Sequence, residues 1–194
     1  MAYARKIVFS KHDEALRAID QISAIHKNVE SSRGARIPDW AYRDVLYMLI
    51  DYSIRAFEAL ERKLNYHEKA EVFTVFNAVG QRMGIHELPE SYSEWMADRK
   101  KHLESDLAYS NLTNDLYKQY HKHLGPVRYE LLKQVQLLIC PDVVMQFLPF
   151  KSFSLFHPVL AIYKLSKFCK LDRIVKAIVL PGQYQEQILA LNAK

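Results

Sequence analysis

Histidine is the residue type with the widest chemistry in this chain, and one of its eight histidines differs from the others in its position. Residues 10–29 show helical spacing of apolar residues, and at 100° per residue His26 falls inside the apolar stripe. The other members of that stripe are Ala15, Ile19, Ile22 and Val29. An inward-facing histidine is either a core residue hydrogen-bonded to backbone or tyrosine, or a ligand of haem iron. The spacing alone favours the core histidine.

A haem site needs one imidazole in an apolar pocket and cationic side chains for the propionates. The helix predicted at 39–63 is apolar on more than one face, which is typical of a central helix and makes it a candidate for the pocket wall. Its wall candidates are Met48, Leu49, Tyr52 and Phe57, and the candidate cations are Arg33, Arg36, Arg43 and Arg55. The residue types a haem site requires are therefore present, but spacing does not choose among the cations.

Motifs for several other reaction classes do not occur in the sequence. There is no Gly-x-Ser-x-Gly elbow and no glycine-rich phosphate loop, which argues against hydrolase and nucleotide-binding functions. The Glu-x-x-His pairs of helical di-iron sites and the His-x-x-x-His zinc motif are also lacking. Surface positions are predicted for the remaining histidines, which are His12, His67, His86, His102, His121, His123 and His157.

A helix corner with clear start and stop signals occupies residues 65–95. Asn65 and Glu68 have the spacing of a capping box. Gly84 is placed to end the helix, and Ile85 is placed to pack back onto its last turn. The corner predicts two helices joined by a short, defined bend.

Start and stop signals also occur on either side of this corner. Ser10 is the expected cap of the first helix, which should end at about Val29, before a polar loop at 31–36. Gly125 and Pro126 predict a break between two later helices.

The corner carries a resemblance to a known family. Val79–Ile85 and Leu88–Tyr92, supported by Asp44–Tyr52 and Ala24–Val29, resemble the MpaB-like oxygenases, whose catalytic domain is shared with the latex-clearing rubber oxygenases. The similarity runs from about Ala15 to Pro149.

The resemblance implies a haem-dependent oxygenase that acts with dioxygen on an apolar, isoprenoid-type small molecule. Haem in the rubber oxygenases is held by a histidine on a central helix, and His26-Lys-Asn-Val29 is similar to that position. Haem b would then bind through His26 as metal ligand, with Met48, Tyr52 and Arg33 as further contacts. Family members usually have a longer N-terminal part with arginine and threonine near the haem. Here Ile7 stands where a threonine is expected, so a shortened member without oxygen chemistry is an alternative.

Two functions from other classes fit the same residues. A haem-free helical binding or scaffold module would keep the helical core and satisfy His26 with a protein hydrogen bond. A peripheral membrane protein would act through its basic C-terminal tail instead. Neither alternative involves catalysis.

The formal net charge of +5 is concentrated in that tail, because residues 151–194 hold seven Lys or Arg and two acidic residues. Such a tail is either a solvated basic face or a contact with an anionic membrane surface. Nucleic acid is not an expected partner, because the charges do not interleave with a recognisable base-stacking module. The apolar stretch Phe147–Phe156 is interpreted as core, as a homodimer interface or as a bilayer contact.

The overall pattern predicts an all-α protein, since no segment shows sustained alternation of apolar and polar residues. We expect a single-domain bundle of about eight to ten helices over residues 1–194, with a family-like core at 1–150 and a basic helical tail at 151–194. Cys140 and Cys169 lack zinc spacing, no signal peptide is evident, and no run of about twenty apolar residues occurs. These features predict a cytoplasmic protein, with membrane association as an alternative.

Overall fold

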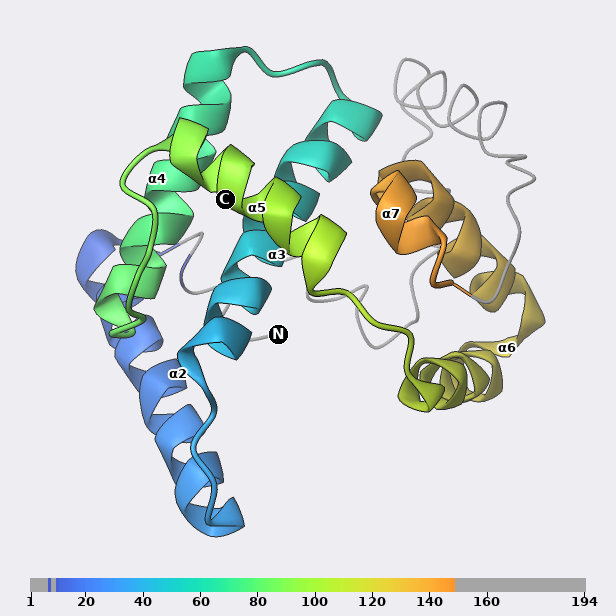
Figure 1. The fold of residues 1–194 in the computed structure, drawn as a ribbon, viewed down its shortest axis with the longest axis horizontal. Coiled ribbons are helices and arrows are strands. Elements are labelled where there is room, and N and C mark those ends of the chain that lie inside the picture. Colours follow the sequence, from blue (N-terminus) through green and yellow to red (C-terminus); the bar gives the residue numbers. More distant parts are fainter. Residues whose placement is uncertain (1–6, 8–9, 149–194) are drawn as a thin grey trace. The chain divides into compact units, whose positions relative to one another are not determined.

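The computed structural model of the chain describes residues 7 and 10–148, which contain six helices (Figure 1). No strand occurs among these residues, so the prediction of an all-α fold is confirmed. The eight to ten helices were expected over the whole chain, and those of the basic tail at 151–194 lie outside the described residues. The membrane and homodimer predictions, which rest mainly on that tail, stay predictions.

The chain divides into two compact units, Met1–Asp106 and Leu107–Lys194. The first unit contains α2 to α5, and the second contains α6 and α7. The single domain with a core at 1–150 also stays a prediction.

Helix α2 (His12–Arg33) is longer than its apolar pattern predicts. It starts after Lys11 with no side-chain hydrogen bond at that end, so the expected cap by Ser10 is wrong. It continues through residues 31–33, where a polar loop was expected, and ends at Gly34 in the left-handed conformation. The difference arises because an apolar stripe marks the buried part of a helix, whereas backbone hydrogen bonding continues until a residue such as glycine turns the chain.

Helices α3 (Asp39–Leu60) and α4 (Tyr66–Arg82) are joined by a short connection that ends in the predicted capping box. The Asn65 side chain accepts a hydrogen bond from the Glu68 amide at 3.0 Å, and the Glu68 carboxylate accepts one from the Asn65 amide at 2.8 Å. Both amides at the start of α4 are thereby satisfied. The start of this helix is therefore determined locally.

The glycines of α4 and its corner have two separate roles. Gly84 has φ of 75°, and the Ile85 amide donates to the Gly80 carbonyl at 3.1 Å, which closes the helix end as predicted. A Cβ atom at Gly80 would lie 2.6 Å from Leu46 Cδ2 and 3.0 Å from Leu88 Cδ1. The missing side chain therefore allows α4 to lie close against α3.

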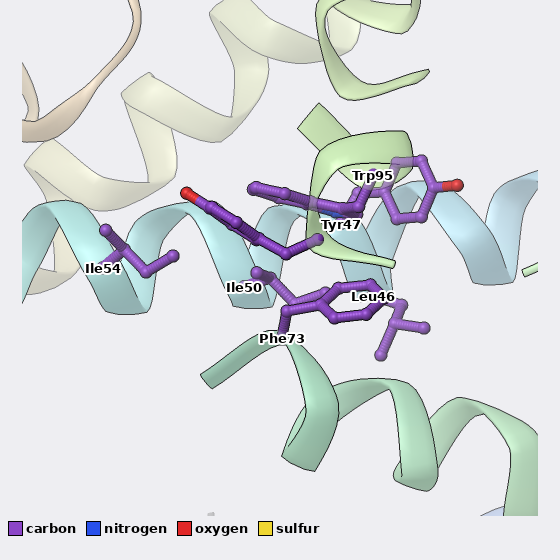
Figure 2. Close-up of a cluster of buried hydrophobic side chains, with 7 residues drawn as sticks. Leu46, Tyr47, Ile50, Ile54, Phe73 and Trp95 are labelled. Atoms are coloured by element: carbon purple, nitrogen blue, oxygen red, sulfur yellow. The ribbon is translucent and has the colours of Figure 1, made fainter. Parts of the chain in front are cut away.

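The core of the first unit lies where α3 meets α4 and α5 (Tyr92–Ser105). Leu46, Ile50 and Ile54 recur every four residues and form a buried row on α3. Figure 2 shows Phe73 of α4 and Trp95 of α5 gathered against this row, with ring centroids 6.4 Å apart. Ile50 is completely buried, so it marks the centre of this core.

The second unit is built on a bent helix followed by a single turn. Helix α6 (Asn111–Ile139) is interrupted at Gly125, which has φ of 73° and ψ of 171° and precedes Pro126, as the sequence predicts. The Tyr117 hydroxyl donates to Gln136 Oε1 at 2.8 Å across the bend. Helix α7 (Asp142–Met145) follows. The two halves of α6 thus contact each other through their side chains.

Candidate functional site

His26 lies on α2, half-buried, and its ring contacts Tyr42 in the first turn of α3. The two ring centroids are 5.3 Å apart and the planes are inclined at 53°. His26 Nδ1 is buried and makes no hydrogen bond to any described residue. Because an unpaired buried polar atom costs about 1–3 kcal/mol, this is not the usual environment of a structural core histidine.

The Tyr42 hydroxyl is directed to a carboxylate and not to the imidazole. It donates to Glu30 Oε1 at 3.3 Å, and the same oxygen accepts the Ile37 amide at 2.8 Å. Burial raises the pKa of Tyr42, and the negative charge of Glu30 raises it further, so the phenol remains a donor at neutral pH. The tyrosine that contacts the His26 ring is therefore not its hydrogen-bond partner.

The predicted wall residues lie on α3 in a second apolar stripe. This stripe has the spacing i, i+3, i+4, i+7 and consists of Val45, Met48, Leu49 and Tyr52. The first three are 50%, 41% and 46% exposed, and Tyr52 is half-buried. At 100° per residue Met48 points about 160° away from Ile50, so the stripe lies on the side of α3 opposite the core.

Among the four candidate cations, Arg33 is the one without an ion pair in the described residues. It is exposed at the end of α2, seven residues after His26 and hence on a similar side of the helix. The other candidates are already engaged, in the pairs Arg36–Asp39, Arg43–Glu87 and Arg55–Asp51. Within this part of the chain, Arg33 thus retains the full hydrogen-bonding capacity of its guanidinium.

The structure contains a buried ionic cluster between α3 and α5, and spacing along the sequence accounts for only part of it. Arg99 is 6% exposed and its Nε lies 3.2 Å from Asp51 Oδ2, while Asp51 Oδ1 also accepts from Arg55 Nε at 2.6 Å. Only the Asp51–Arg55 part follows from i, i+4 spacing on one helix. The contact with Arg99 spans 48 residues of sequence and depends on how α5 crosses α3.

His102 belongs to the same interface, although a surface position was expected for it. Its side chain is 18% exposed, with Nε2 2.7 Å from Asp44 Oδ1 and Nδ1 3.1 Å from Asp106 Oδ2. A signal was available in the sequence, because Trp95, Arg99 and His102 share one helix face with a buried aromatic residue at its start. Unlike His26, this imidazole has both nitrogens paired.

Cavities open on the described residues of both units. A cavity of about 510 Å³ at the end of α3 is lined by Phe57, Leu60, Glu61 and Arg62. A cavity of about 500 Å³ in the second unit is lined by Asn114, Tyr117, Lys118, His121 and Tyr129. Of the predicted wall residues, Phe57 lines the first cavity, and His26 lines neither. Within the described part of the chain, no three His, Cys, Asp or Glu side chains are grouped as a metal site.

Comparison with known families gives one match. Residues 1–161 match the family described as ER-bound oxygenase mpaB/B'/rubber oxygenase, catalytic domain, which confirms the resemblance carried by the helix corner. Curated protein sequences give no significant match, and neither do solved structures. The family description includes ER-bound members, while none of the helices in the described residues is long and apolar enough to cross a bilayer.

Proposed function

Because the chain belongs to the MpaB and rubber oxygenase catalytic-domain family, we propose that it binds haem b through His26 and uses dioxygen to oxidise an apolar substrate. The observation that carries this proposal is the unpaired imidazole on α2. A histidine with a purely structural role would be expected to hold its ring by a protein hydrogen bond, and no described residue supplies one at Nδ1. With Nδ1 turned inward, Nε2 is the nitrogen available to an iron atom.

Apolar residues of α3 and a cation on α2 support a proposal of an apolar cofactor with a charged edge. Tyr42 contacts the imidazole, and Val45 follows one turn later as the start of the apolar stripe on α3. Arg33 lies two turns beyond His26, about 10 Å along the helix axis at 1.5 Å per residue. Because Arg33 lies on a similar side of α2 and has no ion pair in the described residues, it is the residue that would pair with a haem propionate.

Bound haem would supply the activation of dioxygen, and the residues of this chain would supply ligation, charge compensation and an apolar environment. His26 would donate its Nε2 lone pair to the iron. The stripe residues Met48 and Tyr52 would hold the porphyrin and an isoprenoid-type chain away from water. Cleavage of one carbon–carbon double bond by one dioxygen molecule gives two carbonyl groups, so this reaction balances without a further reductant.

Absorbance during a haem titration of the purified full chain tests the ligation. We expect the wild type to develop the Soret band of bound haem at one haem per chain, and His26→Ala to lose it. His12→Ala is the matched control, because His12 is exposed on the same helix and should leave binding unchanged. Equal binding by the wild type and His26→Ala, or binding by neither, would contradict the proposal.

Oxygen uptake tests the substrate class separately. The haem-loaded chain should consume dioxygen in the presence of a dispersed polyisoprenoid and form new carbonyl groups in it. His26→Ala should lower this rate at least about a hundredfold, in line with the loss of an essential catalytic group. Haem binding without oxygen uptake would instead support a family member that keeps the cofactor and lacks oxygen chemistry.

A further inference from the structure

We propose that Tyr42 and Glu30 form a positioning pair that fixes the orientation of the His26 imidazole. This inference rests on the proposed function for its consequence, which is control of the iron ligand. Its structural basis is independent of any cofactor, because it concerns contacts among residues of α2, α3 and the loop between them.

The three side chains meet because of their spacing on two adjacent helices. His26 and Glu30 are one turn apart on α2 and so project from the same side. Tyr42, in the first turn of α3, reaches both: its ring centroid is 5.3 Å from the imidazole and its hydroxyl is 3.3 Å from Glu30 Oε1. One tyrosine therefore links the candidate ligand to a carboxylate four residues further along the chain.

Glu30 is itself held by the backbone. Its Oε1 accepts the Ile37 amide at 2.8 Å, in the connection between α2 and α3. The Tyr42 hydroxyl donates to the same oxygen at 3.3 Å. The ring of Tyr42 is thus fixed at its far end.

The imidazole depends on this ring because its buried nitrogen has no hydrogen bond to the described residues. Histidines that bind metals usually donate their second ring nitrogen to an acceptor, which sets the ring orientation. At His26 the buried Nδ1 has no such acceptor in this part of the chain, so packing, with the Tyr42 ring as one contact, restricts rotation of the imidazole. The aromatic contact replaces the usual second hydrogen bond.

Four variants separate the roles of the ring, the hydroxyl and the carboxylate. Tyr42→Phe keeps the ring and should leave haem affinity within about threefold of the wild type. Tyr42→Ala removes the ring and should weaken haem binding by about 10- to 100-fold, the range found for groups that orient a metal ligand. Glu30→Gln keeps an acceptor oxygen and should resemble Tyr42→Phe, whereas Glu30→Ala should fall between Tyr42→Phe and Tyr42→Ala. Tyr109→Ala, at an exposed tyrosine, is the matched control.

Nitrogen-15 spectra of the imidazoles in the haem-free chain supply a readout that needs no cofactor. In the wild type the His26 ring signals should differ from those of the exposed histidines, and in Tyr42→Ala they should move to the exposed values. Amide exchange at Ile37 should become faster in Glu30→Ala, because the carboxylate that accepts its hydrogen bond is gone. Circular dichroism checks that each variant is folded.

Different variants test the Tyr42–Glu30 positioning pair and the ligation of haem by His26. If Tyr42→Ala changes neither the His26 ring signals nor the haem affinity, the positioning pair is overturned while ligation by His26 stands. If His26→Ala binds haem as the wild type does, the proposed ligation is overturned, and the ring signals of the haem-free chain still decide whether Tyr42 orients the imidazole.

Discussion

The two sides of helix α3 differ in how completely their apolar side chains are buried and their polar groups are paired. On the side facing α4 and α5, Ile50 is fully buried and Asp51 is shared between Arg99 and Arg55. On the opposite side Met48 is 41% exposed. At the start of α3, Tyr42 contacts the ring of His26 from α2, whose buried Nδ1 is not paired by any described residue. The first side has the properties of a packed scaffold, whereas the second leaves apolar side chains exposed to solvent.

The two sides of α3 make different contributions to the free energy of unfolding. Buried apolar area raises the free energy of unfolding, and removing one partner of a buried ion pair lowers it. Exposed apolar groups and unpaired polar atoms cost stability in the isolated chain. The exposed stripe of α3 therefore contributes little to the stability of the folded chain.

The largest expected difference between the two sides comes from truncating one aliphatic side chain on each. Ile50→Ala should lower the free energy of unfolding by about 3–4 kcal/mol, because it leaves a cavity in the core. Met48→Ala, two residues away, should change it by less than about 0.5 kcal/mol. Urea unfolding measures both. A loss above about 2 kcal/mol in Met48→Ala would show that the second stripe is packed in the folded chain, and would remove the contrast.

Asp51 has one buried and one exposed partner, so substitutions of these two arginines measure how burial changes the contribution of an ion pair to stability. Arg99→Met should cost about 3 kcal/mol, because it removes the buried partner and leaves the carboxylate incompletely paired. Arg55→Met is the matched control: Arg55 is 41% exposed in its side chain, and its loss should cost no more than about 1 kcal/mol. Equal costs for the two variants, measured by urea unfolding, would mean that burial of Arg99 does not strengthen the pair.

The smallest effect concerns acid stability and the connection after α3. Lys69 first, then Lys63 and the Leu64 amide, lower the pKa of Glu58 from 4.5 to about 2. A lowered folded-state pKa stabilises the fold above the unfolded value near 4.5, and this contribution is lost as the pH falls from about 5 towards 2. Glu58→Gln should therefore remove about 1–2 kcal/mol at pH 7 and little near pH 2.

A control for this pH effect is Glu71→Gln, since Glu71 is exposed on α4 and makes no ion pair to a described residue. Its unfolding free energy should follow the wild-type pH profile. If Glu58→Gln gives the same pH profile as the wild type, the lowered pKa of Glu58 does not contribute to stability. Thermal unfolding between pH 2 and pH 7 provides the comparison.

Local signals in the sequence were reliable where the structure depends on neighbouring residues. The capping box of Asn65 and Glu68 and the break at Gly125 were predicted correctly, because each is formed within a few residues. The end of α2 lies four residues beyond the predicted Val29, because the apolar stripe marks the buried part of the helix and not its full length. His102 was assigned to the surface because its partners Asp44 and Asp106 include a residue 58 positions away.

The sequence by itself determined the helical class, the start of α4, the family and the identity of His26 as the histidine on an apolar stripe, since periodicity, capping and motif similarity are properties of short segments. Only the tertiary structure decided that Tyr42 donates to Glu30 and leaves the imidazole unpaired, that Arg99 reaches Asp51, and that Arg33 remains without an ion pair within the described residues. Each of these depends on the angle and distance between helices. Those are set by packing at positions such as Gly80 and Ile50, which spacing along the chain does not encode.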